Sequence, residues 1–274
     1  MLSEKMKTKL TELVKEDVSG KDISGSLITE KKCNAIIKLK EKAVVSGIEE
    51  TKFLFESYGI KVKALAINGK TYNKGKILLK LFGSNKKILL VERTALNVLS
   101  RMSGIATLSN KAQKIAGKTK IILTRKTFPG FNEFDKKAGI EGGILPHRKN
   151  LNSAFLFKEN HLKFDSISEL IEKAKKENKN KKEKKVIEVE VKNLSEVKEA
   201  VKTKADVIML DNFSLKEAKK AIKEIRKTKN IKIELSGGIN LSNLKKYSKL
   251  KADFISMGFL THSVKGINLT LLLT

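Results

Sequence analysis

The sequence has no tryptophan, one cysteine and two prolines in 274 residues, and aromatic side chains make up only 5% of it. The single Cys33 excludes an intramolecular disulfide framework and is typical of a protein kept in a reducing compartment. Few aromatic side chains leave few platforms on which single-stranded nucleic acid could stack. We therefore expect a cytoplasmic protein with no specific nucleic-acid partner.

Long apolar runs are also lacking, so we expect no membrane-spanning segment. The first ten residues, MLSEKMKTKL, are charged and lack the apolar core of a signal peptide. A length of 274 residues with 40% apolar content is ordinary for one large globular domain or two smaller ones.

Lysine is abundant, whereas arginine is rare. Of 58 basic residues only five are arginines, and the net charge is +28. The lysines are spread along the whole chain, and the one dense run, NKNKKEKK at 178–185, lies between a helix pattern and a strand pattern. We interpret the charge as solvated helix faces and loops.

The first hundred residues show mixed patterns. Residues 4–15 have helical spacing, Asn68-Gly69 indicates a turn, and residues 77–83 are typical of a buried strand. A long helical periodicity over 87–116 predicts a helix that is broken or bent near Ser103-Gly104.

Beyond residue 120, short apolar runs alternate with charged helical stretches, which favours parallel strands joined by right-handed crossovers. The expected strands are 121–124, 154–157, 186–191, 206–211, 231–236 and 253–258.

Polar residues and glycine stand at the carboxyl ends of these expected strands: Arg125, Lys158, Glu190, Asp211, Ser236 and Gly258. Those ends converge in a barrel, whereas in an open sheet only the strands at the switch point share a site. We therefore predict an α/β fold with a smaller mixed domain at 1–108 and a barrel at 109–264. We expect residues 265–274 to return to the first domain.

The rare cationic residues gather near the same strand ends, as Arg125-Lys126, His147-Arg148 and Lys158. Each one alone is ordinary, because a single histidine or arginine usually serves the backbone or a surface ion pair. Together they predict a pocket for an anionic substrate, since arginine grips a carboxylate or phosphate with two parallel hydrogen bonds.

Two acids lie opposite this cationic cluster. Alternation in VIEVEV places Glu188 and Glu190 on one face, and buried carboxylates need a partner or a metal. Glu190 and Asp211 on successive strands predict a Mg²⁺ site completed by a substrate phosphate. The alternative is that Asp211 caps the next helix.

Small residues follow the next strand. Ser236, Gly237 and Gly238 come after an expected strand and before a helix, which favours a backbone cradle for phosphate. Pro146, after two glycines, indicates a tightly shaped loop that presents His147 and Arg148.

These segments resemble one enzyme family, quinolinate phosphoribosyltransferase, also called nicotinate-nucleotide pyrophosphorylase (carboxylating). The resemblance covers nearly the whole chain, beginning with EDVSGKDIS at 16–24. The motifs that carry it are ERTALNVLSRMSGIAT (92–107), TRKTFPG (124–130), GG and HR within 142–148, KENH (158–161), VEV (189–191), LDN (210–212), LSGGI (235–239) and GFLTHS (258–263).

The resemblance implies an N-terminal open α/β sandwich and an irregular six-stranded β/α barrel. It also implies a homodimer with sites at the subunit interface, and a larger oligomer is an alternative. It implies conversion of quinolinate and phosphoribosyl pyrophosphate, with Mg²⁺, to nicotinate mononucleotide, pyrophosphate and CO₂. The same resemblance implies roles for individual residues. Arg125, His147, Arg148 and Lys158 would hold substrate carboxylates, Arg93 would reach in from the partner subunit, Lys126 would lie near the reacting ring, Glu190 and Asp211 would organise metal and ribose, and Ser236, Gly237 and Gly258 would contact the ribosyl phosphate.

The chain departs from the family pattern at three places. KENH stands where KDNH is usual, Asn150 replaces a glycine, and Ser153 replaces an aspartate. Pro146 and Phe128 resemble the ModD branch, which is associated with molybdenum transport genes. Two alternatives therefore stay open: a ModD-type pyrophosphorylase acting on another acid, and a non-catalytic anion-binding protein.

Overall fold

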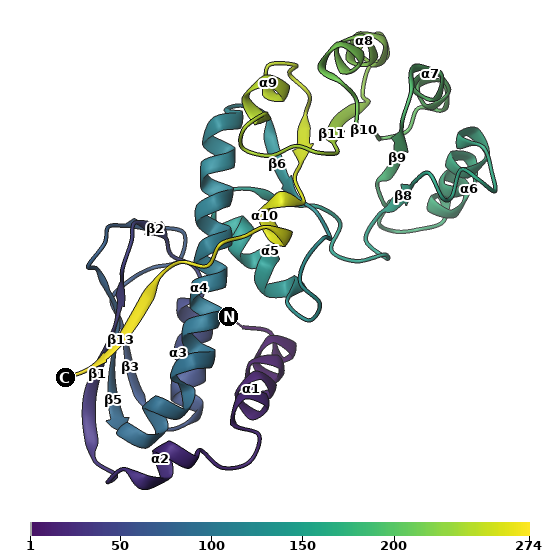
Figure 1. Cartoon of the computed structure of the whole chain (residues 1–274). Coiled ribbons are helices and arrows are strands. Elements are labelled where there is room, and N and C mark those ends of the chain that lie inside the picture. The colour runs from purple at the N-terminus through teal and green to yellow at the C-terminus, as the bar shows by residue number, and fades with distance from the viewer. Residues whose placement is uncertain (1) are drawn as a thin grey trace. The chain divides into compact units, whose positions relative to one another are not determined.

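The computed structural model describes residues 2–274, which form two compact units (Figure 1). The first unit comprises the chain up to residue 110 together with 127–143 and 260–274. The second comprises 111–126 and 144–259. The predicted boundary near residue 108 lies close to this division, but residues 127–143 group with the first unit and not with the strands that flank them in sequence.

A four-stranded antiparallel sheet in the order β13-β1-β5-β3 organises the first unit. Its strands are β1 (Lys32–Leu39), β3 (Lys61–Ala64), β5 (Ile77–Ser84) and β13 (Leu269–Leu273), and a separate short pair joins β2 (Ala43–Val44) to β4 (Thr71–Tyr72). The helices are α1 (Glu4–Val18), α2 (Ile23–Leu27), α3 (Ile48–Ser57), α4 (Asn85–Ala116), α5 (Asn132–Glu141) and α10 (Phe259–His262), although the end of α4 and the first residue of α10 group with the second unit. Because β13 pairs with β1, the C-terminal tail lies in this unit.

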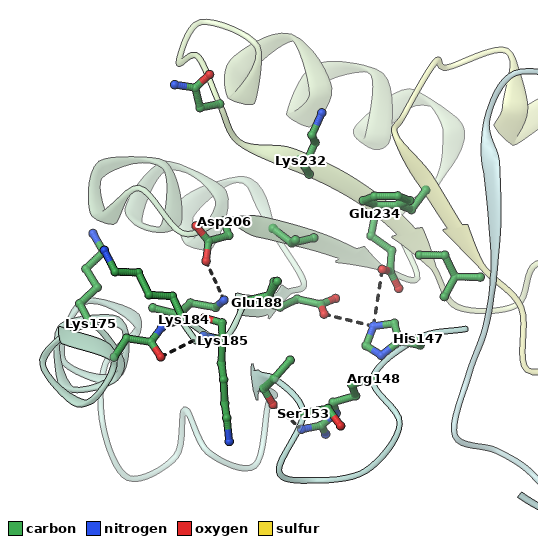
Figure 2. Close-up of a pocket in the computed structure, with 18 of the residues that line it drawn as sticks. His147, Arg148, Ser153, Lys175, Lys184, Lys185, Glu188, Asp206, Lys232 and Glu234 are labelled. Atoms are coloured by element: carbon green, nitrogen blue, oxygen red, sulfur yellow. Dashed lines mark hydrogen bonds and ion pairs between the residues drawn. The ribbon is translucent and has the colours of Figure 1, made fainter. Parts of the chain in front are cut away.

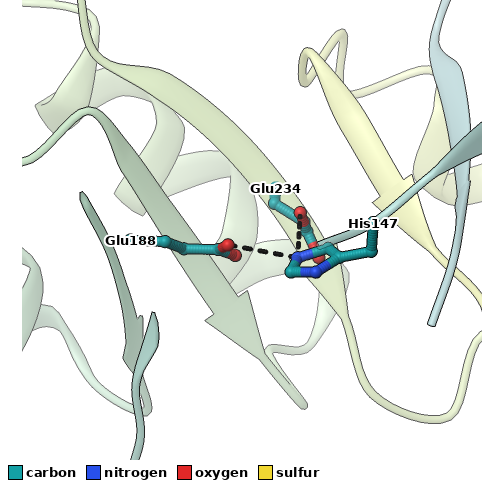
Figure 3. Close-up of side chains that lie close together, drawn as sticks. All are labelled: His147, Glu188 and Glu234. Carbon is teal, nitrogen blue, oxygen red and sulfur yellow. Dashed lines mark ion pairs between the residues drawn. The ribbon is translucent and has the colours of Figure 1, made fainter. Parts of the chain in front are cut away.

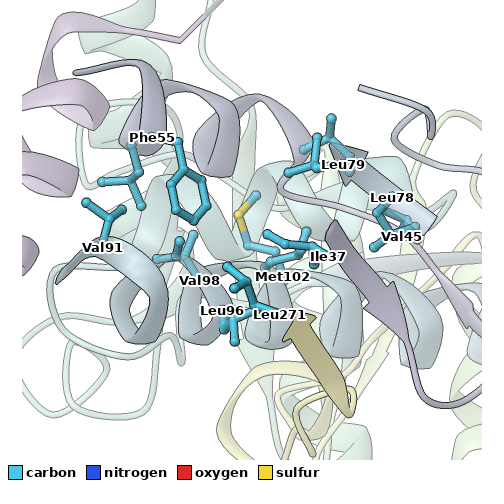
Figure 4. Packing of buried hydrophobic residues seen from close by; sticks show 14 of the residues in the cluster. Ile37, Val45, Phe55, Leu78, Leu79, Val91, Leu96, Val98, Met102 and Leu271 are labelled. Carbon is cyan, nitrogen blue, oxygen red and sulfur yellow. The ribbon is translucent and has the colours of Figure 1, made fainter. Parts of the chain in front are cut away.

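The core of the first unit lies between this sheet and its helices (Figure 4). Helix α1 buries Met6, Leu10 and Val14, which share one face at four-residue spacing. Strand β5 contributes the buried Leu78 and Leu79. The sheet is thereby packed against a helical layer, as expected for an open α/β sandwich.

Helix α4 is continuous over 32 residues, about 48 Å, so the predicted helix is not broken near Gly104, the first of the two possibilities, a break or a bend. Gly104 serves close packing instead. A Cβ at this position would lie 2.4 Å from the carbonyl oxygen of Lys265, so only glycine lets the C-terminal segment cross the helix there.

The second unit is built on a parallel sheet of seven strands in the order β7-β6-β12-β11-β10-β9-β8. The strands are β6 (Lys120–Leu123), β7 (Leu145–Pro146), β8 (Phe155–Phe157), β9 (Ile187–Val191), β10 (Val207–Asp211), β11 (Lys232–Ser236) and β12 (Phe254–Ser256). The predicted α/β class and its parallel strands are confirmed, with β7 as a strand that the sequence did not reveal. Among residues 2–274, β7 and β8 do not pair with each other, so the curled sheet is a half-barrel whose hydrogen-bonded ladder does not close.

Charged helices connect these strands: α6 (Ile167–Lys179), α7 (Leu194–Thr203), α8 (Leu215–Ile225) and α9 (Leu244–Ser248). Ser166 and Ser214 begin α6 and α8 with capping boxes that use Glu169 and Glu217. No helix in the described part of the chain has the length and apolar character to cross a membrane.

Candidate functional site

All predicted site residues except Arg93 lie at one end of the parallel sheet. Because the strands run in the same direction, their carboxyl ends share one edge. Arg125 and Lys126 follow β6, His147 and Arg148 follow β7, Lys158 follows β8, Glu190 and Asp211 lie at the ends of β9 and β10, Ser236 and Gly237 end and follow β11, and Gly258 follows β12. Arg93 lies on α4 in the first unit.

Glu190 is buried and forms an ion pair with Lys158. The ion pair offsets the free-energy cost of burying a carboxylate in the sheet. Lys158 is itself nearly half exposed, and its backbone N–H donates to Nδ1 of His161 at 2.9 Å. The ammonium group therefore stands between a buried acid and the solvent-facing end of the sheet, where an anion or a metal can compete for either partner.

Asp211 does not cap the following helix, because Ser214 is the N-cap of α8. Its Oδ2 accepts a hydrogen bond of 2.7 Å from the side-chain amide of Asn212. Strand β10 lies beside β9, with Met209 opposite Glu190. The two carboxylates thus stand at adjacent strand ends, and oxygen donors of this kind suit Mg²⁺.

The turn after β11 requires glycine. Gly237 has φ +86°, and a Cβ there would lie 2.3 Å from Oδ1 of Asn212 and 2.5 Å from its backbone nitrogen. That nitrogen donates to the carbonyl of Ser236 at 3.0 Å, so the ends of β10 and β11 are held together. Such a turn brings backbone N–H groups close to a bound phosphate, which a side chain would displace.

Arg125 acts on Arg148 through its positive charge. Burial lowers the pKa of Arg148, and the charge of Arg125 lowers it further. Arg148 also donates from Nη1 to the carbonyl of Ala154 at 3.3 Å. An anion placed between the two guanidinium groups would relieve their repulsion, which favours a carboxylate or phosphate ligand.

A pocket of about 1070 Å³ within the second unit contains only His147 and Arg148 of the predicted residues (Figure 2). It extends toward the amino ends of the strands, where Lys232 and Val207 begin β11 and β10. The predicted site residues therefore share the carboxyl ends of the strands, and most of them lie outside this pocket. His147 and Arg148 lie where the two regions meet.

His147 lies between two buried glutamates (Figure 3). Its Nε2 is 3.1 Å from Oε2 of Glu188 and 3.7 Å from Oε2 of Glu234, and the donor atoms of all three residues lie within 4.8 Å of one another. Burial opposes protonation of the ring, but the hydrogen bond and charge of Glu188, with the charge of Glu234, raise the pKa of His147. Burial, together with repulsion from Glu188, raises the pKa of Glu234 to about 7.

Glu234 was not predicted as a site residue, and Glu188 was recognised only as a buried acid. A signal for Glu234 was present, because it stands two residues before Ser236 on the same strand and so shares its face. What the sequence could not reveal is that His147, 41 and 87 positions earlier in the chain, meets both acids.

Comparison with family models and known proteins shows which family the chain belongs to. A model of the C-terminal domain of quinolinate phosphoribosyl transferase matches residues 105–272, and the corresponding N-terminal domain model matches 17–103. The chain is 42% identical over 267 residues to the probable nicotinate-nucleotide pyrophosphorylase [carboxylating] of Methanocaldococcus jannaschii, covering 93% of this chain and 92% of that protein. It is 34% identical to the protein of the same name from Archaeoglobus fulgidus, covering 89% and 95%.

A solved structure has the same fold along the whole chain. The nicotinate-nucleotide pyrophosphorylase from Francisella tularensis superposes with a TM-score of 0.93 and is 33% identical, covering 100% of this chain and 98% of that one. Similarity of this extent includes both units and every strand that contributes to the site.

Proposed function

Because the chain belongs to the quinolinate phosphoribosyl transferase family, we propose that it transfers the phosphoribosyl group of phosphoribosyl pyrophosphate to quinolinate. The products are nicotinate mononucleotide, pyrophosphate and CO₂, and the reaction is a step of NAD biosynthesis. We place this reaction in the cytoplasm. The observation that carries the proposal is the convergence of cationic side chains and two acids at the carboxyl end of one parallel sheet.

Quinolinate is a dianion, and the cationic side chains suit it. Arg125, His147, Arg148 and Lys158 would bind its two carboxylates and orient the ring nitrogen toward the ribose. Orientation of this kind supplies much of the rate enhancement in a two-substrate reaction. Lys126 would lie beside the reacting ring and the departing pyrophosphate.

The ribosyl phosphate would occupy the turn formed by Ser236 and Gly237, with Gly258 beside it. The nitrogen of quinolinate forms a bond to C1 of the ribose as the bond from C1 to pyrophosphate breaks. The 2-carboxylate then leaves as CO₂, and its electron pair on the ring carbon takes a proton. Cationic groups around the pyrophosphate stabilise the charge that develops as it leaves.

Mg²⁺ fits the acids of this edge. Glu190 and Asp211 offer carboxylate oxygens at adjacent strand ends, and the substrate's phosphates would supply further oxygen ligands. Bound there, the ion would neutralise the departing pyrophosphate. Lys158, which pairs with Glu190 in this structure, would then bind a substrate carboxylate.

The site requires a second subunit in this proposal. Arg93 would reach a substrate carboxylate in the partner's half-barrel, so the working form would be a homodimer. Family resemblance at ERTALN, which contains Arg93, supports this assignment.

A steady-state assay of pyrophosphate release tests the proposal. Purified chain, phosphoribosyl pyrophosphate and Mg²⁺ are incubated separately with quinolinate, nicotinate and other pyridine acids. We expect quinolinate to be preferred, activity to vanish in chelator, and Mg²⁺ to restore it. Preference for another acid would support the ModD-type alternative, and anion binding without turnover would support a non-catalytic role.

A further inference from the structure

The proposed chemistry leaves two buried acids without a role. Glu188 lies on β9 with 4% of its surface exposed, and Glu234 lies on β11 with 1% exposed. Figure 3 shows both side chains pointing at His147, which follows β7. Three different strands thus bring these groups to one point inside the half-barrel.

Both acids approach the same atom of the histidine. Their Oε2 atoms lie 3.1 and 3.7 Å from Nε2 of His147, whereas the Oε1 atom of each is buried without a hydrogen bond. Two buried carboxylates so close together repel each other unless one of them takes up a proton or a positive charge lies between them. The atom they share, Nε2, is where that charge can reside.

We propose that Glu188 and Glu234 are positioning residues that hold His147 as an imidazolium, with its Nε2–H directed at the acids and its Nδ1–H left to donate to a substrate carboxylate. The inference rests on the proposed binding of an acidic substrate at this end of the sheet. It assigns to the two acids a function that neither the cationic pocket nor the Mg²⁺ site provides.

The electrostatic surroundings agree with this geometry. The charged groups that act on the ring are Glu188 and Glu234, which favour the imidazolium, and Arg148, which opposes it. Lys158 acts on Glu234, and Arg125 acts on Arg148. Without the two acids, burial and Arg148 would both favour neutral imidazole, which has one ring N–H in place of two, so a substrate carboxylate would lose its charge-assisted hydrogen bond.

A divalent cation is the rival occupant of the same point. One imidazole nitrogen and two carboxylates within 4.8 Å of one another also form a metal-type donor set. A proton and a metal make different predictions. A metal requires neutral imidazole nitrogen at the bond, whereas the proposed state carries protons on both ring nitrogens.

The chain allows a direct test because it has only three histidines. The full-length protein is labelled with ¹⁵N and ¹³C in histidine, and the His147 resonances are assigned by their loss in His147→Gln. We expect imidazolium shifts at pH 7 and a midpoint above the ordinary value near 6.5. In Glu188→Gln the midpoint should fall by about one pH unit or more, in the direction set by removing an adjacent charge.

Two further variants make the result specific. Glu188→Asp keeps the charge and should preserve a raised midpoint, and it serves as well if Glu188→Gln does not fold. Glu183→Gln, an exposed acid in the same unit, should leave the His147 midpoint unchanged. Neutral His147 in the unmodified protein, or an equal midpoint in Glu188→Gln and Glu183→Gln, would overturn the inference. Stoichiometric bound metal that is lost in Glu234→Gln would overturn it too.

Kinetics link the protonation state to substrate binding. At pH 7.5 we expect Glu188→Gln to lower kcat/KM for quinolinate by about tenfold, with KM for phosphoribosyl pyrophosphate within about twofold. An unchanged kcat/KM for quinolinate in a variant with the lowered midpoint would contradict the link to the substrate. If the protein does not use quinolinate at all, the proposed function fails, while the NMR result still decides the state of His147.

Discussion

At the residue scale, the five arginines stand out because almost every other positive charge of the chain is a lysine. Arg101 shows what the guanidinium contributes: its Nε and Nη2 bind the two oxygens of buried Asp135 at 2.8 and 2.7 Å. Phe128 and Phe131 lie beside the same guanidinium. This arginine is structural, so the rarity of arginine does not by itself distinguish packing from substrate binding.

Arg125 and Arg148 should require the same fork for a substrate carboxylate. We expect Arg125→Lys and Arg148→Lys each to lose about 1–3 kcal/mol of transition-state stabilisation, about ten- to a hundredfold in kcat/KM, with the fold retained. Arg226→Lys is the control, because Arg226 forms a surface ion pair with Asp253 that contributes about 0–1 kcal/mol. Equal kinetics in all three variants would remove the arginines from the site.

Glu234 should make stability depend on pH. Its pKa is raised to about 7 in the folded chain, against about 4.3 for an unfolded glutamate, so the folded state binds this proton more tightly. Its contribution is complete below about pH 4 and is lost as pH rises through about 7. Urea unfolding should therefore show that the stability of the unmodified protein relative to Glu234→Gln decreases between pH 4 and 8. A difference that does not vary with pH would contradict the raised pKa.

At the scale of secondary-structure elements, the long elements could be predicted from their strong periodicity, whereas the shortest ones could not. The alternation of apolar strands with capped amphipathic helices predicted the parallel sheet and the edge on which the polar residues lie. The two-residue strand β7 escaped notice because a pairing so short leaves no pattern. The predicted break at Gly104 failed for another reason: local propensity disfavours glycine in a helix, but close packing of Lys265 requires it.

Helix α4 supplies a stability test of that packing. We expect Gly104→Ala to destabilise the protein by about 1–3 kcal/mol, although alanine favours helix, because the added methyl group forces the C-terminal segment away. Lys111→Ala, at an exposed position of the same helix, should change stability by less than about 0.5 kcal/mol. Thermal unfolding compares the two, and a stabilised Gly104→Ala protein would show that the crossing is looser than described.

At the scale of the whole molecule, the chain divides into two units that contribute different predicted residues. The half-barrel carries the cationic cluster and the acids, whereas Arg93 lies on α4 in the first unit. No pattern within one chain could reveal which half-barrel Arg93 serves, because that depends on assembly. The assignment to the partner subunit comes from family resemblance alone.

Mixing inactive variants tests the shared site. Arg93→Ala and Lys126→Ala should each be inactive, and a mixture should regain part of the activity because one of the two sites in a heterodimer contains both intact groups. Mass spectrometry of the mixture establishes that subunits exchange. Exchange without any recovered activity would contradict a site shared between subunits.

The central claim, a carboxylating phosphoribosyl transfer, is tested most directly by following the carboxylate that leaves. Quinolinate labelled at the 2-carboxyl carbon is incubated with the purified protein, phosphoribosyl pyrophosphate and Mg²⁺, and labelled CO₂ and nicotinate mononucleotide are measured together. The account predicts equal amounts of both products and neither without phosphoribosyl pyrophosphate. Consumption of phosphoribosyl pyrophosphate without release of the label, or retention of both carboxylates in the nucleotide, would contradict it.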